Sequence, residues 1–131
     1  MTCAVDTNVL LDIFLPDPAY GRISLERIEA AYAQGALIIC AAVYAELAPQ
    51  FAERSLLDET LARMGIQVRE IGKDSAFLAG SAWKEYTRRG GRRDRIITDF
   101  LIGAFAEVHA DQFLTRDRGF YRQYFKNLKQ L

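Results

Sequence analysis

The chain has 131 residues, of which 50% are hydrophobic and 26% are charged, a composition typical of one folded domain and not of a disordered segment. Its 17 basic and 17 acidic residues balance, so any nucleic-acid-binding surface must be local. No segment resembles a signal peptide or a membrane span. We therefore expect a single domain over residues 1–131, located in the cytoplasm without a membrane partner, with Cys3 and Cys40 as reduced core thiols.

Short apolar runs alternate with helical patterns along the chain. Strands are expected at 3–5, 36–42, 66–71 and 112–116. Helices are expected at 8–15, 20–34, 42–53, 55–64, 74–89 and 96–109. The helices at 42–53 and 55–64 should be broken near Pro49 and Ser55. Because strands and helices alternate, the strands should be parallel and joined by right-handed crossovers. The predicted fold is an α/β three-layer sandwich, with a central, mostly parallel sheet of four to five strands flanked by helices.

Four acidic residues stand where predicted strands give way to helices. They are Asp6, Glu46, Asp99 and Asp117. The binding crevice of a parallel sheet lies beyond the carboxyl ends of its strands, so these side chains should meet there. Four neighbouring carboxylates repel one another, and a divalent cation removes that conflict. Oxygen ligands without His or Cys select Mg²⁺ or Mn²⁺ and not zinc.

Each acid also has a simpler interpretation. Asp6 is placed to cap the helix that follows it, and Asp99 to add a favourable charge to a first helical turn. Glu46 fits a solvated helix face, and Asp117 fits the start of a turn before Gly119. The coincidence of four acids at strand ends favours a shared site.

Four segments in this order and spacing carry a resemblance to a known family. They are VDTNVLLD, YAEL, TDFLIGAFA and FLTRDRGFY. Together they resemble PIN-domain ribonucleases, and most closely the toxin subunits of VapBC-type toxin–antitoxin pairs. The resemblance covers nearly the whole chain and implies a PIN-like form of the expected sandwich.

The resemblance also implies roles for individual residues. It makes Asp6, Glu46, Asp99 and Asp117 the catalytic, metal-binding acids, with Mg²⁺ as cofactor and Mn²⁺ as a substitute. It implies that Asn8 and Thr115 orient carboxylates or the attacking water. It implies an RNA substrate, a homodimer, and a cognate antitoxin that blocks the crevice with an apolar helix and an arginine.

The segment RRGGRRDR, residues 88–95, has five arginines in eight positions. Arginine forks match phosphate oxygens. Arg92, Arg93, Arg95 and Arg116 are therefore candidates for contact with RNA phosphates. A solvated loop is the alternative interpretation of residues 88–95.

The sequence predicts a Mg²⁺-dependent endoribonuclease that acts as the toxin of a type II toxin–antitoxin pair. The only histidine, His109, cannot supply the acid–base pair of a metal-free ribonuclease. A phosphatase or phospho-acceptor with Asp6 as nucleophile would want a second acid beside Asp6 and a lysine near the last strand, and neither is present. A non-catalytic PIN-fold binding module is the other alternative.

Overall fold

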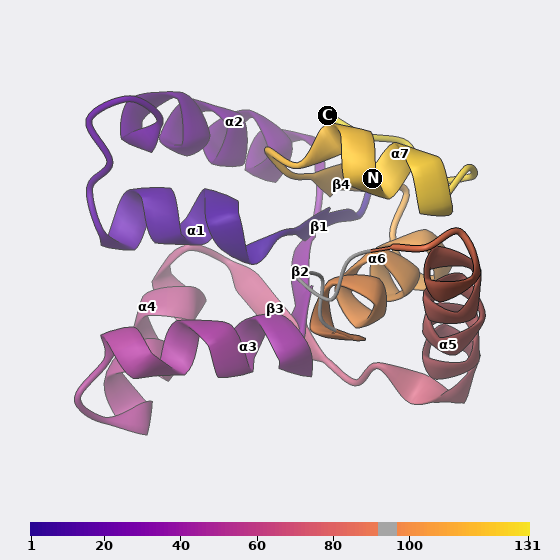
Figure 1. Ribbon diagram of the computed structural model, residues 1–131. Coiled ribbons are helices and arrows are strands. Elements are labelled where there is room, and N and C mark those ends of the chain that lie inside the picture. The colour runs from indigo at the N-terminus through magenta and orange to yellow at the C-terminus, as the bar shows by residue number, and fades with distance from the viewer. Residues whose placement is uncertain (92–96) are drawn as a thin grey trace.

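Figure 1 shows the computed structural model of the chain, which describes residues 1–91 and 97–131. In this part of the chain one parallel sheet forms from β1 (Cys3–Val5), β2 (Leu37–Cys40), β3 (Ile66–Arg69) and β4 (Gln112–Leu114). Their order across the sheet is β3-β2-β1-β4. The predicted α/β class and parallel sheet are confirmed, and the carboxyl ends of β1 and β4 are neighbours.

Helices lie on both sides of these strands. The described residues form α1 (Thr7–Phe14), α2 (Gly21–Gln34), α3 (Ala41–Leu47), a 3-10 turn η1 (Ala48–Gln50), α4 (Arg54–Arg63), α5 (Gly72–Arg88), α6 (Ile97–His109) and α7 (Arg118–Tyr124). Figure 1 shows α1 to α4 to the left of the strands, and α5 and α6 to their right. This arrangement is the expected three-layer sandwich.

The structure corrects the sequence prediction at several element boundaries. The helix expected over 42–53 ends at Leu47 and tightens into η1. The break expected near Pro49 is confirmed, because proline has no N–H to continue an α-helix. The strand expected over 112–116 ends at Leu114. The α7 helix was not predicted at all. Within α5, Gly80 is exposed with no heavy atom within 4 Å of a Cβ built on it, so this glycine does not serve close packing.

The apolar helix α6, which carries the candidate acid Asp99 in its first turn, contributes several buried side chains to the core. Phe100 and Phe105 of this helix are fully buried. At Gly103 a Cβ would come within 2.5 Å of the Phe125 ring and 2.9 Å of the Tyr121 ring. A glycine at this point therefore lets the segment around α7 pack directly on α6, which positions the residues that follow β4.

Both cysteines lie in the central strands, Cys3 in β1 and Cys40 in β2. They are free and buried, as expected. Burial raises the pKa of the Cys3 thiol to about 11, so this side chain stays protonated and acts as a small core residue. No helix within residues 1–91 and 97–131 combines the length and apolarity needed to cross a membrane.

Candidate metal centre

Asp6 is a buried carboxylate at the carboxyl end of β1. Its side chain is 5% exposed, and its backbone N–H donates to the carbonyl of Leu114 at 2.9 Å, which ties it to the end of β4. As N-cap of α1, Asp6 accepts a hydrogen bond from the Thr7 N–H on Oδ1 at 2.8 Å. Oδ2 accepts from the Thr115 hydroxyl at 2.6 Å. The simpler capping interpretation therefore holds for one oxygen, while the other is fixed by a residue 109 positions away.

Burial makes the ionised form of Asp6 costly. It raises the pKa of the Asp6 carboxyl from 3.8 to about 6, and the charges of Asp99 and Glu46 also raise it. The hydrogen bonds from Thr115 and Thr7 oppose this rise by favouring the carboxylate. No basic side chain acts on this pKa among the causes found in the described part of the chain. A cation placed at Asp6 would lower the pKa and recover the cost.

Glu46 is joined to Asp6 through Thr7. The Thr7 hydroxyl donates to Oε1 of Glu46 at 2.6 Å, while the backbone of the same residue donates to Asp6. Thr7 is itself buried. It was not singled out from the sequence, although its place directly after Asp6 at the start of α1 was visible there. One threonine thus sets the relative positions of two candidate ligands.

Asp117 is tied to the same carboxylate through Thr115. The fully buried Thr115 hydroxyl donates to Asp6 and accepts from the Asp117 N–H at 2.9 Å. Asn8 contacts this loop too, since its Oδ1 accepts from the Arg116 N–H at 3.4 Å, a long and therefore weak hydrogen bond. Thr115 therefore contacts two of the candidate acids, whereas Asn8 contacts the backbone of Arg116.

Asp99 lies in the first turn of α6 and is partly buried. Its proximity to the other acids is seen in two pKa values. Its charge raises the pKa of Asp6. Burial raises the pKa of the Tyr121 hydroxyl far above its usual range, and Asp6, Asp99 and Asp117 raise it further. Tyr121, on the unpredicted α7 helix, therefore faces three of the four acids and stays protonated.

These acids share one region but do not form a closed ligand set. Within residues 1–91 and 97–131, no three His, Cys, Asp or Glu side chains are arranged so that they could hold a metal ion together. Like charges at ligand spacing repel, so a cation must draw the carboxylates together. The donor chemistry nevertheless fits a hard divalent cation, because the acids offer oxygen alone and no basic side chain of the described residues is a partner of the buried Asp6 carboxylate.

The arginines near the site are placed differently from one another. Arg116 donates from Nε and a terminal nitrogen to the buried Asp12, at 2.7 and 2.9 Å. These two guanidinium nitrogens already have a carboxylate as partner. Arg89 pairs with Glu85 at 2.8 Å, and Arg88 is 3.8 Å from the same carboxylate. Arg92, Arg93 and Arg95 lie outside the described residues.

The Arg116–Asp12 pair is a clamp between α1 and the loop after β4. Asp12 also accepts from the Ser24 hydroxyl at 2.7 Å, which brings α2 into the same network. The Arg116 guanidinium lies 4.1 Å from the centre of the Tyr20 ring, a cation–π distance. The clamp fixes the loop that carries Thr115 and Asp117.

Comparison with known proteins places this geometry in a family. A model of the PIN domain matches residues 3–126. No curated protein matches. Among solved structures, VapBC2 from Rickettsia felis bound to a DNA fragment from their promoter is similar, with TM-score 0.75 and 17% identity over 100% of this chain and 98% of that one. VapBC-1 from nontypeable Haemophilus influenzae is similar with TM-score 0.72 and 17% identity, over 100% of this chain and 97% of that one. FitAcB from Neisseria gonorrhoeae is similar with TM-score 0.65 and 19% identity, over 98% of this chain and 96% of that one.

The buried carboxylate predicts an unusual dependence of stability on pH. The pKa of Asp6 is about 6 in the folded protein against an ordinary 3.8. The folded state therefore holds this proton more tightly, and without metal the stability falls as pH rises between these values, by about 3 kcal/mol. Asp6→Asn removes this loss, so the variant should be the more stable protein at neutral pH and nearly equal to wild type below pH 4. Urea unfolding in EDTA across this range measures it.

Glu59→Gln on α4 is the matched control, because that carboxylate is exposed and its removal should leave the pH profile unchanged. An Asp6→Asn protein less stable than wild type at neutral pH would contradict the account of Asp6.

The clamp predicts that Arg116 acts on stability through Asp12. Arg116→Met keeps the apolar stem but leaves the Asp12 charge buried and unpaired. We expect a loss of about 2 kcal/mol, below the roughly 3–5 kcal/mol of fully buried pairs because Arg116 is partly exposed to water. Asp12→Asn added to this variant removes the unpaired charge and should restore at least half of the loss. Additive losses in urea unfolding would show that the two side chains are not coupled.

Proposed function

This chain belongs to the PIN domain family, and from that premise we propose that it is a divalent-metal-dependent endoribonuclease. The observation that supports the proposal most is the Asp6 carboxylate, which is buried, held by two hydrogen bonds and surrounded by other acids. Such a group is unfavourable in a protein that never binds a cation. In a protein that binds a cation, the same buried carboxylate serves as a ligand.

The proposed ligands are Asp6, Glu46, Asp99 and Asp117, and the proposed ion is Mg²⁺, with Mn²⁺ as a substitute. Both ions favour carboxylate and water oxygens. A bound divalent cation supplies an activated water and neutralises charge on the phosphate and its leaving oxygen. RNA as the substrate is likewise a proposal, drawn from the sequence resemblance to PIN-domain ribonucleases.

The chain's own residues serve to hold the acids in place. Thr115 fixes Oδ2 of Asp6 and the backbone of Asp117 at the same time. Thr7 fixes Glu46 and Oδ1 of Asp6. Because these hydroxyls are already engaged with carboxylates, their role is to position ligands. The Tyr121 hydroxyl, protonated beside three acids, reduces their repulsion.

A non-catalytic PIN-fold binding module remains the second candidate. It would keep the fold without needing the Asp6 carboxylate, whose ionisation opposes folding above pH 6. No observation favours this candidate over the enzyme. A cytoplasmic location also stays a prediction, and the free, buried cysteines agree with a reducing compartment.

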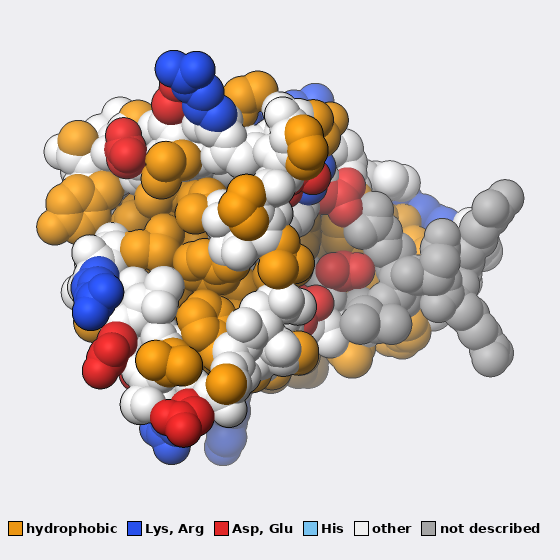
Figure 2. Space-filling model, turned by 90° about the vertical axis from the view of Figure 1, so that its left-hand side faces the viewer, with side chains coloured by type: hydrophobic (Ala, Val, Ile, Leu, Met, Phe, Trp, Pro, Cys, Tyr) orange, Lys and Arg blue, Asp and Glu red, His pale blue; other side chains and the backbone are white. Residues whose placement is uncertain are grey.

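We also propose that the chain is a toxin controlled by an antitoxin protein. Similar structures include complexes named VapBC, bound to DNA in two of them, and one named a toxin–antitoxin complex. On the face carrying α1 to α4, Figure 2 shows a hollow with hydrophobic side chains gathered in it. Tyr44, Phe51 and Leu57 line a pocket between α3 and α4, and Phe14 of α1 packs edge-on against Phe51. An apolar helix of an antitoxin fits such a surface.

A homodimer is proposed from the same resemblance. Phe77 on α5 supports it, because this large apolar side chain is 80% exposed. A second copy of the chain would remove it from water. Phe77 lies on α5, whereas Phe51 lies in the segment between η1 and α4, so the two proposed partners use separate surfaces.

The cleavage proposal predicts the chemistry of the product ends. With Mg²⁺ present, the purified protein should cut a structured RNA to give 5′-phosphate and 3′-hydroxyl ends, because water attacks phosphorus and the RNA 2′-hydroxyl takes no part. EDTA and Asp6→Asn should each abolish cutting, whereas Glu59→Gln should not. Mass spectrometry of the fragments decides between the mechanisms. Cyclic phosphate ends that persist in EDTA would contradict the metal-dependent reaction.

Two variants test the two partner proposals against each other. Phe51→Ala should weaken the complex with a cognate antitoxin and leave the dimer intact. Phe77→Ala should weaken the dimer and leave antitoxin binding intact. Light scattering of the chain alone and of the mixture reports both. A variant that behaves as wild type in its own assay rules out the surface assigned to it.

A further inference from the structure

A second feature lies beside the acidic cluster, on the side of α2. It is a pocket of about 330 Å³ lined by Val9, Tyr20, Ile23, Ser24, Arg27, Thr115, Arg116 and Arg118. This volume is at the lower end of the range of about 300–1,000 Å³ that holds small ligands. Its walls are apolar at Val9 and Ile23. None of these lining residues is acidic.

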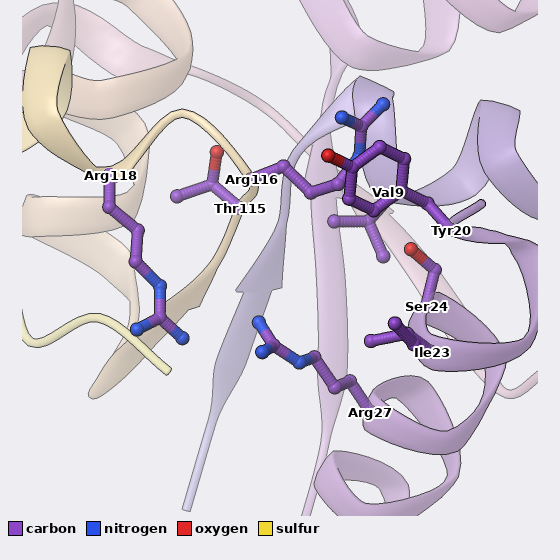
Figure 3. A pocket seen from close by; sticks show the side chains of 8 residues that line it. All are labelled: Val9, Tyr20, Ile23, Ser24, Arg27, Thr115, Arg116 and Arg118. Atoms are coloured by element: carbon purple, nitrogen blue, oxygen red, sulfur yellow. The ribbon is translucent and has the colours of Figure 1, made fainter.

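Two arginine side chains enter this pocket from opposite walls. Figure 3 shows the guanidinium of Arg27, from α2, and that of Arg118, from the start of α7, pointing toward one another across the pocket. Neither forms an ion pair with any residue of 1–91 or 97–131 among those found. The third arginine, Arg116, points away and is neutralised by Asp12. Two converging cations repel each other, and an anion between them removes that repulsion.

We propose that Arg27 and Arg118 form an anion pocket that holds a backbone phosphate of bound RNA, next to the phosphate at the acidic cluster. This inference rests on the proposed function. Arginine forks match the geometry of phosphate oxygens and supply sequence-independent contacts. The pocket is a site of binding, separate from the carboxylates that hold the metal.

The position of the pocket favours RNA over an acidic protein segment. Thr115 lines the pocket and donates its hydroxyl to Asp6, so the two sites share a wall. Arg118 directly follows the candidate ligand Asp117. A nucleic-acid strand carries a phosphate at every nucleotide, so a strand bound at the acidic cluster presents another phosphate nearby. The apolar wall at Val9 and Ile23 suits the sugar between them.

The test measures RNA binding without cleavage. Fluorescence anisotropy of a labelled single-stranded RNA in EDTA gives Kd across a series of salt concentrations for Arg27→Gln, Arg118→Gln and the double variant. Each single change should raise Kd severalfold and reduce the slope of log affinity against log salt by about 0.7, and the double change by about 1.4. Arg22→Gln is the matched control, on the same helix but exposed and paired with Glu26, and it should match wild type. Melting temperatures confirm that each variant is folded.

The outcomes separate this inference from the proposed function. If wild type cleaves RNA with Mg²⁺ but the double variant keeps the wild-type Kd and slope, the pocket proposal is overturned and the nuclease stands. If the slope falls as expected but wild type never cleaves RNA, the pocket stands and the nuclease does not. A double variant that keeps RNA binding and loses binding to polyglutamate would assign the pocket to an acidic protein segment, and overturn the proposal.

Discussion

The candidate site depends on one buried carboxylate held between two parallel strands. Asp6 follows β1 directly, and its backbone continues the pairing with β4 through the carbonyl of Leu114. Its side chain cannot turn away, because Thr7 holds one oxygen and Thr115 the other. The protein thereby fixes an acid whose pKa burial has raised to about 6. This arrangement lowers stability at neutral pH, and a bound cation would recover the lost stability.

The four residues that follow β4 make different contacts and have different roles. Thr115 supports the buried carboxylate, and Arg116 anchors the loop to Asp12 on α1. Asp117 is presented to the acidic cluster, and Arg118 enters the neighbouring pocket. Because the clamp and the threonine fix both sides of this loop, a small shift in one should displace the others. The proposed metal centre and the proposed phosphate pocket therefore both include residues of this one segment.

Part of this arrangement could be predicted from the sequence. The alternation of apolar runs with helical patterns predicts a parallel sheet, and a parallel sheet brings strand-end acids such as Asp6 and Asp117 to one edge. The roles of Thr7 and Arg116 could not be predicted from the sequence, because each role depends on a partner far away in the chain. Arg116 beside an acid indicates phosphate binding, yet the structure gives it Asp12, 104 residues earlier. The short α7 helix has too few residues for a periodic pattern to show.

The central claim is that Asp6, Glu46, Asp99 and Asp117 gather around a divalent cation. The most direct measurement is X-ray diffraction from crystals soaked in Mn²⁺, with data collected at the manganese absorption edge. We expect an anomalous peak at ligand distance, about 2.2 Å, from oxygens of Asp6 and of at least two of the other acids. The same soak of the Asp6→Asn protein should lose or weaken that peak. A wild-type crystal with manganese bound elsewhere, or with none near Asp6, would contradict the account.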